Sequence, residues 1–316
     1  MATLELFSGE TLSNMMRASA SLLKKYRRHL NAINVFPVAD GDTGANMYLT
    51  MEAIIEELDE NDVSSIKDAA DLIARGSFMG ATGNSGVILS QFFGGFSNTL
   101  NEYQHIGPLE FSKALKNGAE KAYEAVLSPQ EGTILTVIKE SAFAAEKAAK
   151  KGSSFIDMLY SSYYEAKDTL QETPELLPVL KKAGVVDAGG QGFVYIMEGW
   201  LKTLTNGEFV ESDSIHIEEE AVAKDTEEED EYRFCTEFII ESDYLTADET
   251  REILDSYGGS LVTAKNNNMV RVHIHTNNPK SIIKKCKKYG AISRLKIDDM
   301  SKQHREFLFV NDKDPS

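Results

Sequence analysis

Two aspartates stand one glycine apart in the stretch NVFPVADGDTGANM, residues 34–47. Asp40 and Asp42 lie on a predicted turn, with Pro37 before it, Gly44 after it and an apolar helical pattern next. An exposed turn or a helix cap would explain one aspartate. Clustered carboxylates are also the ligands of hard cations, and Mg²⁺ fills its remaining positions with water and phosphate oxygens. The spacing therefore leaves a capped turn and a magnesium site as alternatives.

Three further glycine-rich turns each precede a helical pattern. They are GSFMGATGNSGVILSQ (76–91), EGTILT (131–136) and KAGVVDAGGQGF (182–193). Glycines let backbone N–H groups approach an anion, and a helix N-terminus adds partial positive charge. Neither a P-loop nor a Rossmann glycine motif occurs, which excludes those two sites. Each turn alone is an ordinary helix–helix connection, but a phosphate-rich ligand at one end of a helical barrel would account for all of them.

The elements that must hold these turns are helices. Apolar residues recur at spacings of three and four within residues 45–58, 111–127, 133–150 and 154–170. Further helical segments follow Ser8, Asn84 and Gly190. Because almost nothing here alternates as a strand, we predict a bundle or barrel of about seven or eight antiparallel helices over residues 1–208.

An acid-rich segment separates this part from the rest of the chain. The run IEEEAVAKDTEEEDE (217–231) repels itself, so we predict a linker over residues 209–231. Residues 232–316 then change period and read as β-α-β-β-α-β, with a capping box formed by Thr246 and Glu249. This order is the split βαβ, or ferredoxin-like, arrangement. The predicted fold class is therefore an all-α domain followed by a small α+β domain.

Strand alternation places a cysteine and two histidines together. In VRVHIHT (270–276), His273 and His275 share one face, and Cys235 of the first strand lies on a neighbouring strand in this topology. We expect the three to converge on the sheet face not covered by helices. A thiolate with two imidazoles suits Zn²⁺, with water, a carboxylate or a partner group as fourth ligand. The alternative is two surface histidines beside a half-buried cysteine, and we predict that Cys286 only packs.

Composition narrows the class of protein. The 316 residues carry a net charge of −17, which disfavours nucleic acid as a partner because phosphate binding needs a basic surface. The sequence contains no unbroken run of about 18 apolar residues, which is the length that a membrane span needs. Its first residues also lack the pattern of a signal peptide. With only two cysteines, the chain is predicted to be cytoplasmic and free of disulfides.

Four stretches together carry a family resemblance: NVFPVADGDTGANM, GATGNSGVILSQFFGGF, EGTILTV and DAGGQGF. They resemble the nucleotide-binding domain of the dihydroxyacetone kinase family, L-subunit type, and more closely the ATP-binding subunit of bacterial fatty-acid kinase. The resemblance covers residues 1–205 and continues through EYRFCTEF and VRVHIHT, which are similar to the middle domain of that subunit. It implies an antiparallel eight-helix barrel that binds ATP through two Mg²⁺ ions, and a zinc-binding middle domain. The ATP subunit of that family normally carries a further C-terminal domain, whereas this sequence stops at Ser316. A shortened piece of such a subunit and a naturally short relative are therefore alternatives, and they differ in whether the chain can complete catalysis alone.

The resemblance assigns roles to single residues. Asp40 and Asp42 match the metal-binding acids, while Asn34 stands nearest the place of a third acid, one residue out of register. The positions matched to phosphate or nucleotide contacts are Thr43, Asn46, Asn84, Ser85, Gly86, Thr133 and Asp187.

The predicted function is an ATP-dependent kinase subunit of phospholipid metabolism, which phosphorylates a fatty acid held by a separate carrier protein; a homodimer is an open alternative to a monomer. A fatty-acid carboxylate is already ionised at pH 7, so no general base is needed, and none of the four motifs contains a histidine. The product would be an acyl phosphate. A dihydroxyacetone-type small-molecule kinase and a non-catalytic ATP-sensing module are the alternatives, and Asp40 with Asp42 favours turnover.

Overall fold

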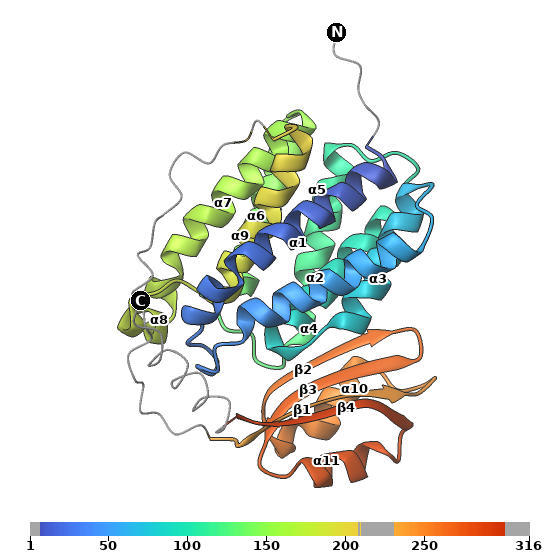
Figure 1. Cartoon of the computed structure of the whole chain (residues 1–316), viewed down its shortest axis with the longest axis vertical. Helices are drawn as coiled ribbons and strands as arrows, with labels where there is room; N and C mark the ends of the chain where they lie inside the picture. Colours follow the sequence, from blue (N-terminus) through green and yellow to red (C-terminus); the bar gives the residue numbers. More distant parts are fainter. Residues whose placement is uncertain (1–6, 208, 210–230, 301–316) are drawn as a thin grey trace.

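The computed structural model describes residues 7–207, 209 and 231–300. Within them, nine helices form a first, helical unit that stands above a small sheet (Figure 1). Eight of these helices pack in ring order: each contacts the next along the chain, α7 contacts α9, and α9 returns to α1. The helices are α1 (Gly9–Ala32), α2 (Thr43–Glu60), α3 (Ile66–Gly80), α4 (Gly83–Leu100), α5 (Pro108–Ala125), α6 (Ile134–Lys150), α7 (Phe155–Leu176), the short α8 (Pro178–Ala183) and α9 (Ala188–Leu204).

Local sequence sets where these helices begin. Ser8, Ser65 and Ser154 each accept a backbone N–H of the first turn that follows, as an N-cap residue does. The apolar faces then meet in a core whose centre is aromatic, with rings from α4, α5 and α9 packed edge to face and in offset stacks. The predicted helical first part is confirmed. The short α8, which begins at Pro178, is an element that the periodicity did not predict.

The second unit follows the predicted β-α-β-β-α-β order. Its four strands form one antiparallel sheet in the order β2-β3-β1-β4, with the first and third strands as central neighbours. The capping box of Thr246 and Glu249 is present. The elements are β1 (Phe234–Glu241), α10 (Ala247–Leu254), the 3₁₀ turn η1 (Asp255–Tyr257), β2 (Gly259–Asn266), β3 (Met269–Thr276), α11 (Pro279–Cys286) and β4 (Ala291–Asp299).

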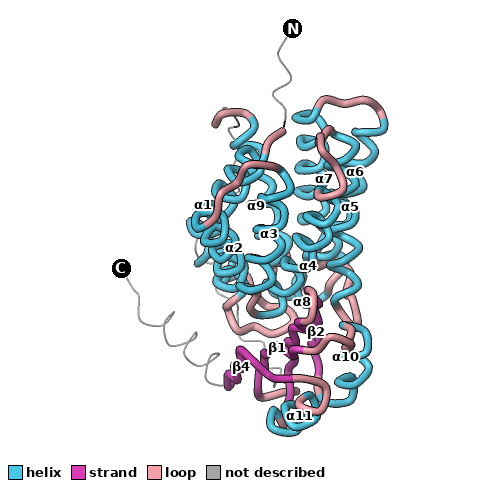
Figure 2. Tube along the Cα trace, turned by 90° about the vertical axis from the view of Figure 1, so that its right-hand side faces the viewer, coloured by secondary structure: helices cyan, strands magenta, loops and turns pink. Residues whose placement is uncertain are grey.

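The two faces of this sheet have different neighbours. One face packs against α10 and α11, and buried Cys286 lies in that core as predicted. The other face turns toward the ends of α3 and α4 in the helical unit (Figure 2). Val262 and Ile239 from this second face belong to the same apolar core as the helices. The second unit is therefore packed against the helical unit through this face of the sheet.

A buried arginine holds the units together. Arg271 of β3 donates to the carbonyls of Phe78, Met79 and Ala81 at the C-terminal end of α3, at 2.8–3.0 Å. Burial lowers the pKa of Arg271 to about 10, so the guanidinium is still charged at neutral pH. Its positive charge also complements the partial negative charge of the helix C-terminus. Arg294 of β4 reaches the Met79 carbonyl too, from an exposed position.

We expect Arg271→Ala to lower the free energy of unfolding by about 3 kcal/mol, because it leaves buried carbonyls without donors. The matched control is Arg294→Ala, which removes an exposed donor to one of the same carbonyls and should cost less than about 1 kcal/mol. Urea unfolding followed by circular dichroism measures both. Equal effects of the two substitutions would contradict the role given to Arg271.

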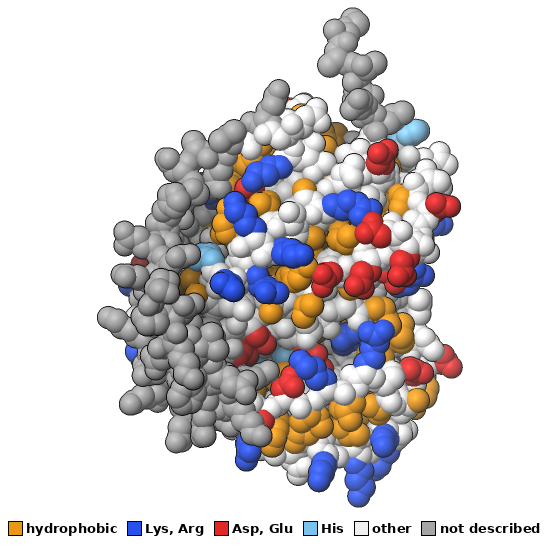
Figure 3. Space-filling view, viewed as in Figure 1, with side chains coloured by type: hydrophobic (Ala, Val, Ile, Leu, Met, Phe, Trp, Pro, Cys, Tyr) orange, Lys and Arg blue, Asp and Glu red, His pale blue; other side chains and the backbone are white. Residues whose placement is uncertain are grey.

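One patch of the surface combines apolar and basic side chains. Apolar side chains gather over β4 and α11 with lysines around them (Figure 3). The apolar residues include Ile283, Leu295 and Ile297, and the lysines include Lys280, Lys284 and Lys287. Among the described residues, no helix has both the length and the apolarity needed to cross a membrane. Most of the predicted linker, residues 209–231, and the last residues, 301–316, lie outside the described residues.

Candidate functional site

The two aspartates lie on the loop between α1 and α2. Asn34 braces this loop: its Nδ2 donates to the Val38 carbonyl and its Oδ1 accepts the Thr43 N–H, both at 2.9 Å. Asp42 precedes α2 directly, yet its carboxylate accepts no capping hydrogen bond from that helix. The capped-turn alternative therefore does not describe Asp42. Because both ends of the Asn34 amide hold the loop, we assign Asn34 a positioning role and leave it out of the metal ligands that we propose.

The electrostatics of the acid pair are unfavourable in the absence of a cation. Burial raises the pKa of Asp40 well above its usual value, and the neighbouring charge of Asp42 raises it further. Two close carboxylates disfavour each other's ionisation, whereas a bound divalent cation would favour it. The donor set, two carboxylates on one short loop, fits Mg²⁺.

The turn before α4 faces this loop. Gly83 begins α4 with a φ of 62°, and a Cβ added there would lie 2.1 Å from the Asn46 side chain. Ser85 Oγ lies 3.3 Å from Thr43 Oγ1, so the two helix starts meet through their hydroxyl groups. The buried Oδ1 of Asn84 has no hydrogen-bond partner among the described residues. Backbone N–H groups and polar side chains thus converge at one helix N-terminus, which is an arrangement suited to an anion.

The predicted phosphate-loop residues divide into two groups. Thr43, Asn84 and Ser85 line cavities, whereas Asn46 and Gly86 are not among the residues that line the two cavities described below. Asn46 packs beneath Gly83, and a Cβ at Gly86 would lie 2.6 Å from Thr50 Oγ1. Their places indicate that they shape the loop from behind.

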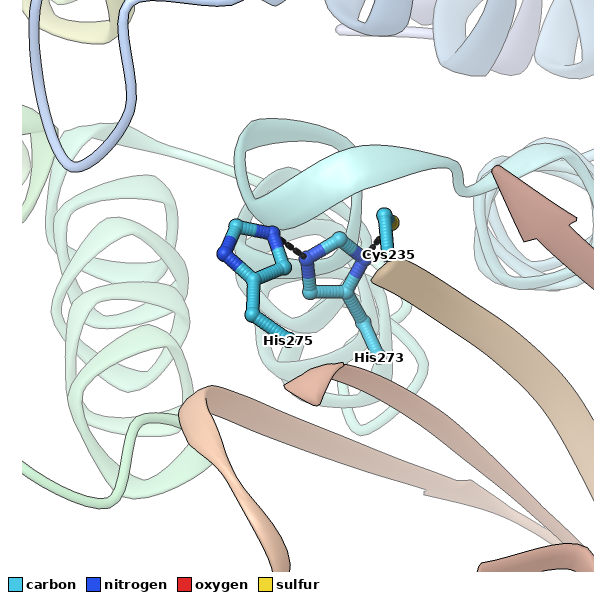
Figure 4. A group of neighbouring side chains, drawn as sticks. All are labelled: Cys235, His273 and His275. Atoms are coloured by element: carbon cyan, nitrogen blue, oxygen red, sulfur yellow. Dashed lines mark hydrogen bonds between the residues drawn. The ribbon is translucent and has the colours of Figure 1, made fainter. Parts of the chain in front are cut away.

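The cysteine and both histidines converge as predicted. Cys235 Sγ lies 3.7 Å from His273 Nδ1, and His273 Nε2 lies 3.2 Å from His275 Nε2. One possible ligand atom from each residue lies within 4.8 Å of the other two. The three side chains project from the strands toward the helical unit (Figure 4). The expectation of a face not covered by helices is corrected: α10 and α11 lie on the other face, but the ends of α3 and α4 cover this one.

The geometry and charge of this cluster fit a metal ion. Two nitrogens 3.2 Å apart have about the separation of two ligands of one tetrahedral zinc at 2.0–2.1 Å each. Burial opposes protonation of His273, but Cys235 and Glu237 raise its pKa well above the usual value. Burial and the charge of His273 lower the pKa of His275 to about 3. At neutral pH His273 is therefore protonated and His275 is neutral, so the pair carries one positive charge. A bound metal cation could replace that proton.

Glu237 connects this cluster to the turn before α4. Its Oε1 accepts the Gly83 N–H at 2.6 Å and lies 2.9 Å from His273 Nδ1, while Thr82 Oγ1 donates to Oε2 at 3.3 Å. Burial alone would raise the pKa of Glu237, but His273 and the Gly83 amide lower it to about 2. A carboxylate on the second imidazole nitrogen orients a metal-binding histidine. The sequence analysis gave Glu237 no role.

Both groups of residues line one small cavity, which we call the acid cavity. Its volume is about 30 Å³, room for an ion or a water molecule but not for a chain of phosphates. The sequence analysis did not predict that the aspartates and the cysteine–histidine cluster would share a cavity. It also missed two residues of β4 that complete the wall, Lys296 and Asp298, which pair at 2.7 Å.

A larger cavity, the base cavity, adjoins the acid cavity. It has a volume of about 370 Å³, within the range of small-molecule pockets. The two cavities share Pro37, Thr43, Asn84 and Ser85. Thr133, which caps α6, and Asp187, which caps α9, both line the base cavity. All four of the predicted glycine-rich or acid-bearing helix entrances thus open onto two connected cavities.

Asp187 also has a structural role. Its Oδ2 accepts the Gly190 N–H at 2.7 Å, and the amides of Ile134 and Gly189 also bond to the carboxylate, so Asp187 caps α9 and α6 together. Burial nevertheless raises the pKa of Asp187 from 3.8 to about 6. The stability that protonation contributes is fully present below pH 3.8 and is lost as the pH rises through 6.

Asp187→Asn should remove this pH dependence, because asparagine keeps an acceptor oxygen and cannot ionise. Between about pH 4 and about pH 6.5 we expect the free energy of unfolding of the unmodified chain to fall by about 2 kcal/mol relative to the variant. Urea unfolding at a series of pH values measures the difference. Parallel pH profiles for the two proteins would show that the raised pKa is wrong.

The fold and the site define a helical unit whose helix entrances converge on an acid pair, followed by a small α/β unit. The DAK2 domain family matches residues 37–202, and the middle domain of FakA-like fatty acid kinase proteins matches residues 231–307. The chain belongs to the DAK2 domain family, and its two domains are those of a FakA-like fatty acid kinase protein.

Curated relatives extend beyond the matched region. Protein YloV of Bacillus subtilis (strain 168) is 38% identical over 314 residues, covering 95% of this chain and 57% of the relative. An uncharacterised protein of Staphylococcus saprophyticus is 37% identical over 312 residues, covering 95% of the chain and 56% of the relative. The chain thus spans a little over half the length of these relatives. The crystal structure of the dihydroxyacetone kinase from C. freundii in complex with AMP-PNP and Mg²⁺ aligns with a TM-score of 0.49 at 18% identity, over 64% of this chain and 36% of that one.

Proposed function

We propose that this chain is the ATP-binding part of a kinase, in which Asp40 and Asp42 hold the magnesium ions of Mg–ATP. The observation that carries the proposal is the placement of this acid pair. The carboxylate of Asp42 caps no helix, burial disfavours the charge on Asp40, and both face the N-terminus of α4 across a cavity the size of an ion. Membership of the DAK2 domain family supports it.

The connected cavities suggest how the nucleotide lies. The base and ribose occupy the base cavity, and the phosphates lie at its boundary with the acid cavity, beside Thr43, Asn84 and Ser85. Bound magnesium neutralises the charge of the β- and γ-phosphates, which is most of what phosphoryl transfer requires of its site. The hydroxyls of Thr43 and Ser85 and the N–H groups at the start of α4 donate to phosphate oxygens.

We further propose that the acceptor is the carboxylate of a fatty acid held by a separate carrier protein, and that the product is an acyl phosphate. The match to the middle domain of FakA-like fatty acid kinase proteins supports this acceptor. An ionised carboxylate attacks without a general base. This agrees with the structure, in which His273 contacts both His275 and Glu237 and the two histidines are held in the cysteine–histidine cluster.

We also propose that Cys235, His273 and His275 bind Zn²⁺. The donor set, the 3.2 Å separation of the two Nε2 atoms and the orienting carboxylate of Glu237 support a structural site. The proposal keeps the domain limits 1–208, 209–231 and 232–316. It treats the first domain as an eight-helix barrel, in line with the closed order of helix contacts, and the last as ferredoxin-like, in line with its strand order.

ATP consumption with and without a fatty-acid-loaded carrier protein tests this function. We expect turnover that requires both the carrier and the fatty acid. Turnover with dihydroxyacetone and without a carrier would favour the small-molecule kinase instead. Tight Mg–ATP binding without turnover on any acceptor would favour an ATP-sensing module.

A further inference from the structure

We propose that the α/β unit forms one wall of the nucleotide site, and that Ser260 and Leu261 at the start of β2 contact the base or the ribose. The proposal rests on the proposed function, because it takes a nucleotide as the occupant of the base cavity. It assigns nucleotide recognition to both units of the chain, whereas every nucleotide position predicted from the sequence lies in the helical unit.

The first support is a backbone connection between the units beside the cavity. Val126, directly after α5, forms an antiparallel bridge with Val262 of β2, and the Leu127 N–H donates to the Leu261 carbonyl at 3.3 Å. This short pairing adds a segment of the helical unit to the edge of the sheet. The same segment continues through Ser128 and Gln130 along the cavity wall. The two walls are therefore hydrogen-bonded to each other beside the cavity.

The second support is the lining of the cavity. Residues 258–262 of the α/β unit line it together with apolar side chains of the helical unit, which include Phe36, Ile88, Ile134 and Leu135. An apolar slot with a few polar groups at its edge suits a flat heteroaromatic base better than a phosphate. Ser128, Gln130 and Ser260 are the polar residues on the side formed by β2 and its paired segment.

The third support is direction. The residues shared with the acid cavity are Pro37, Thr43, Asn84 and Ser85, so the phosphate end of a bound nucleotide lies there. Residues 258–262 line the base cavity but are not among the residues that line the acid cavity. With the phosphates directed at Asp40 and Asp42, the base is the part of the nucleotide that can reach β2.

The backbone of β2 is built for this position. Ser260 has a φ of 48°, in the left-handed region that few residues adopt. A Cβ added to Gly258 would lie 2.0 Å from the His275 carbonyl oxygen, and Gly259 is the register partner of His275. The start of β2 is thus held closely against β3, and Ser260 is on the cavity wall.

Ser260→Phe tests the proposal by filling the cavity from the α/β side. Binding of AMP-PNP and of inorganic tripolyphosphate, each with Mg²⁺, is measured by calorimetry. We expect the variant to bind AMP-PNP at least about 10-fold more weakly than the unmodified chain and to bind tripolyphosphate equally well, because the wall faces the base. Ser256→Phe is the matched control: the same substitution at an exposed residue of η1, outside the cavity lining, should change neither affinity.

Each outcome decides the question. Unchanged AMP-PNP binding in Ser260→Phe overturns the wall while the kinase proposal stands. An equal loss for both ligands also overturns it, because the substitution would then have damaged the site as a whole. If the unmodified chain binds no AMP-PNP, the kinase proposal and this one fail together. Ser260→Asn is a second variant for the case that Ser260→Phe misfolds, because asparagine tolerates the left-handed backbone at this position. We expect it to weaken AMP-PNP binding less than phenylalanine does and to leave tripolyphosphate binding unchanged.

Discussion

Asp42→Asn should remove most of the magnesium-dependent part of nucleotide binding and at the same time stabilise the ligand-free protein. With magnesium, we expect the unmodified chain to bind AMP-PNP at least about 100-fold more tightly than in EDTA, because metal bridging contributes several kcal/mol. The variant should lose most of that difference. Without nucleotide, its free energy of unfolding should rise by about 1 kcal/mol, because burial and the charge of Asp42 both raise the pKa of Asp40.

The opposite signs of the two effects make this prediction specific. A substitution that merely disturbed the loop would lower both affinity and stability. Asp40→Asn should behave in the same way as Asp42→Asn, and Asp62→Asn, on an exposed connection after α2, serves as the control with no effect on either quantity. Calorimetry gives the affinities and urea unfolding gives the stabilities. Full magnesium dependence in both loop variants would remove the acid pair from the site.

Cys235→Ser should remove a stoichiometric zinc ion and destabilise the α/β unit by several kcal/mol, because structural zinc contributes its binding free energy to folding. The unmodified chain, purified without chelator, should contain about one zinc per molecule by elemental analysis. The loss should be largest around β1 and β3, which carry the three proposed ligands. Thermal unfolding with and without a chelator measures the contribution to stability.

The second cysteine supplies the control for zinc. Burial raises the pKa of the Cys286 thiol to about 12, so the group stays neutral in the core between α11 and the sheet. Cys286→Ala should therefore keep its zinc while losing some packing energy. An unmodified chain that folds normally without metal, or equal zinc content in both cysteine variants, would end the zinc assignment.

The sequence predicted most of the elements because local rules govern them. Apolar spacing of three and four located the long helices, and the Thr246–Glu249 capping box located α10. Alternation in β3 and the neighbouring position of β1 were enough to bring Cys235, His273 and His275 together. These predictions succeeded because each depends on residues in one element or in two paired strands.

The docking of the two units could not be predicted from such patterns. The contacts of Arg271 with Phe78 and of Glu237 with Gly83 join residues 193 and 154 positions apart, and nothing in either local sequence specifies the other. For this reason the sequence analysis treated the acid loop and the cysteine–histidine cluster as separate sites. The structure brings them to one cavity and gives Glu237 a connecting role.

A crystal of this chain grown with Mn²⁺ and AMP-PNP, with diffraction recorded at the manganese edge, tests the central claim most directly. The account predicts anomalous density at the carboxylates of Asp40 and Asp42, in contact with the phosphates, and the base inside the cavity of about 370 Å³. An ordered nucleotide whose phosphates lie away from two metal-free aspartates would contradict it.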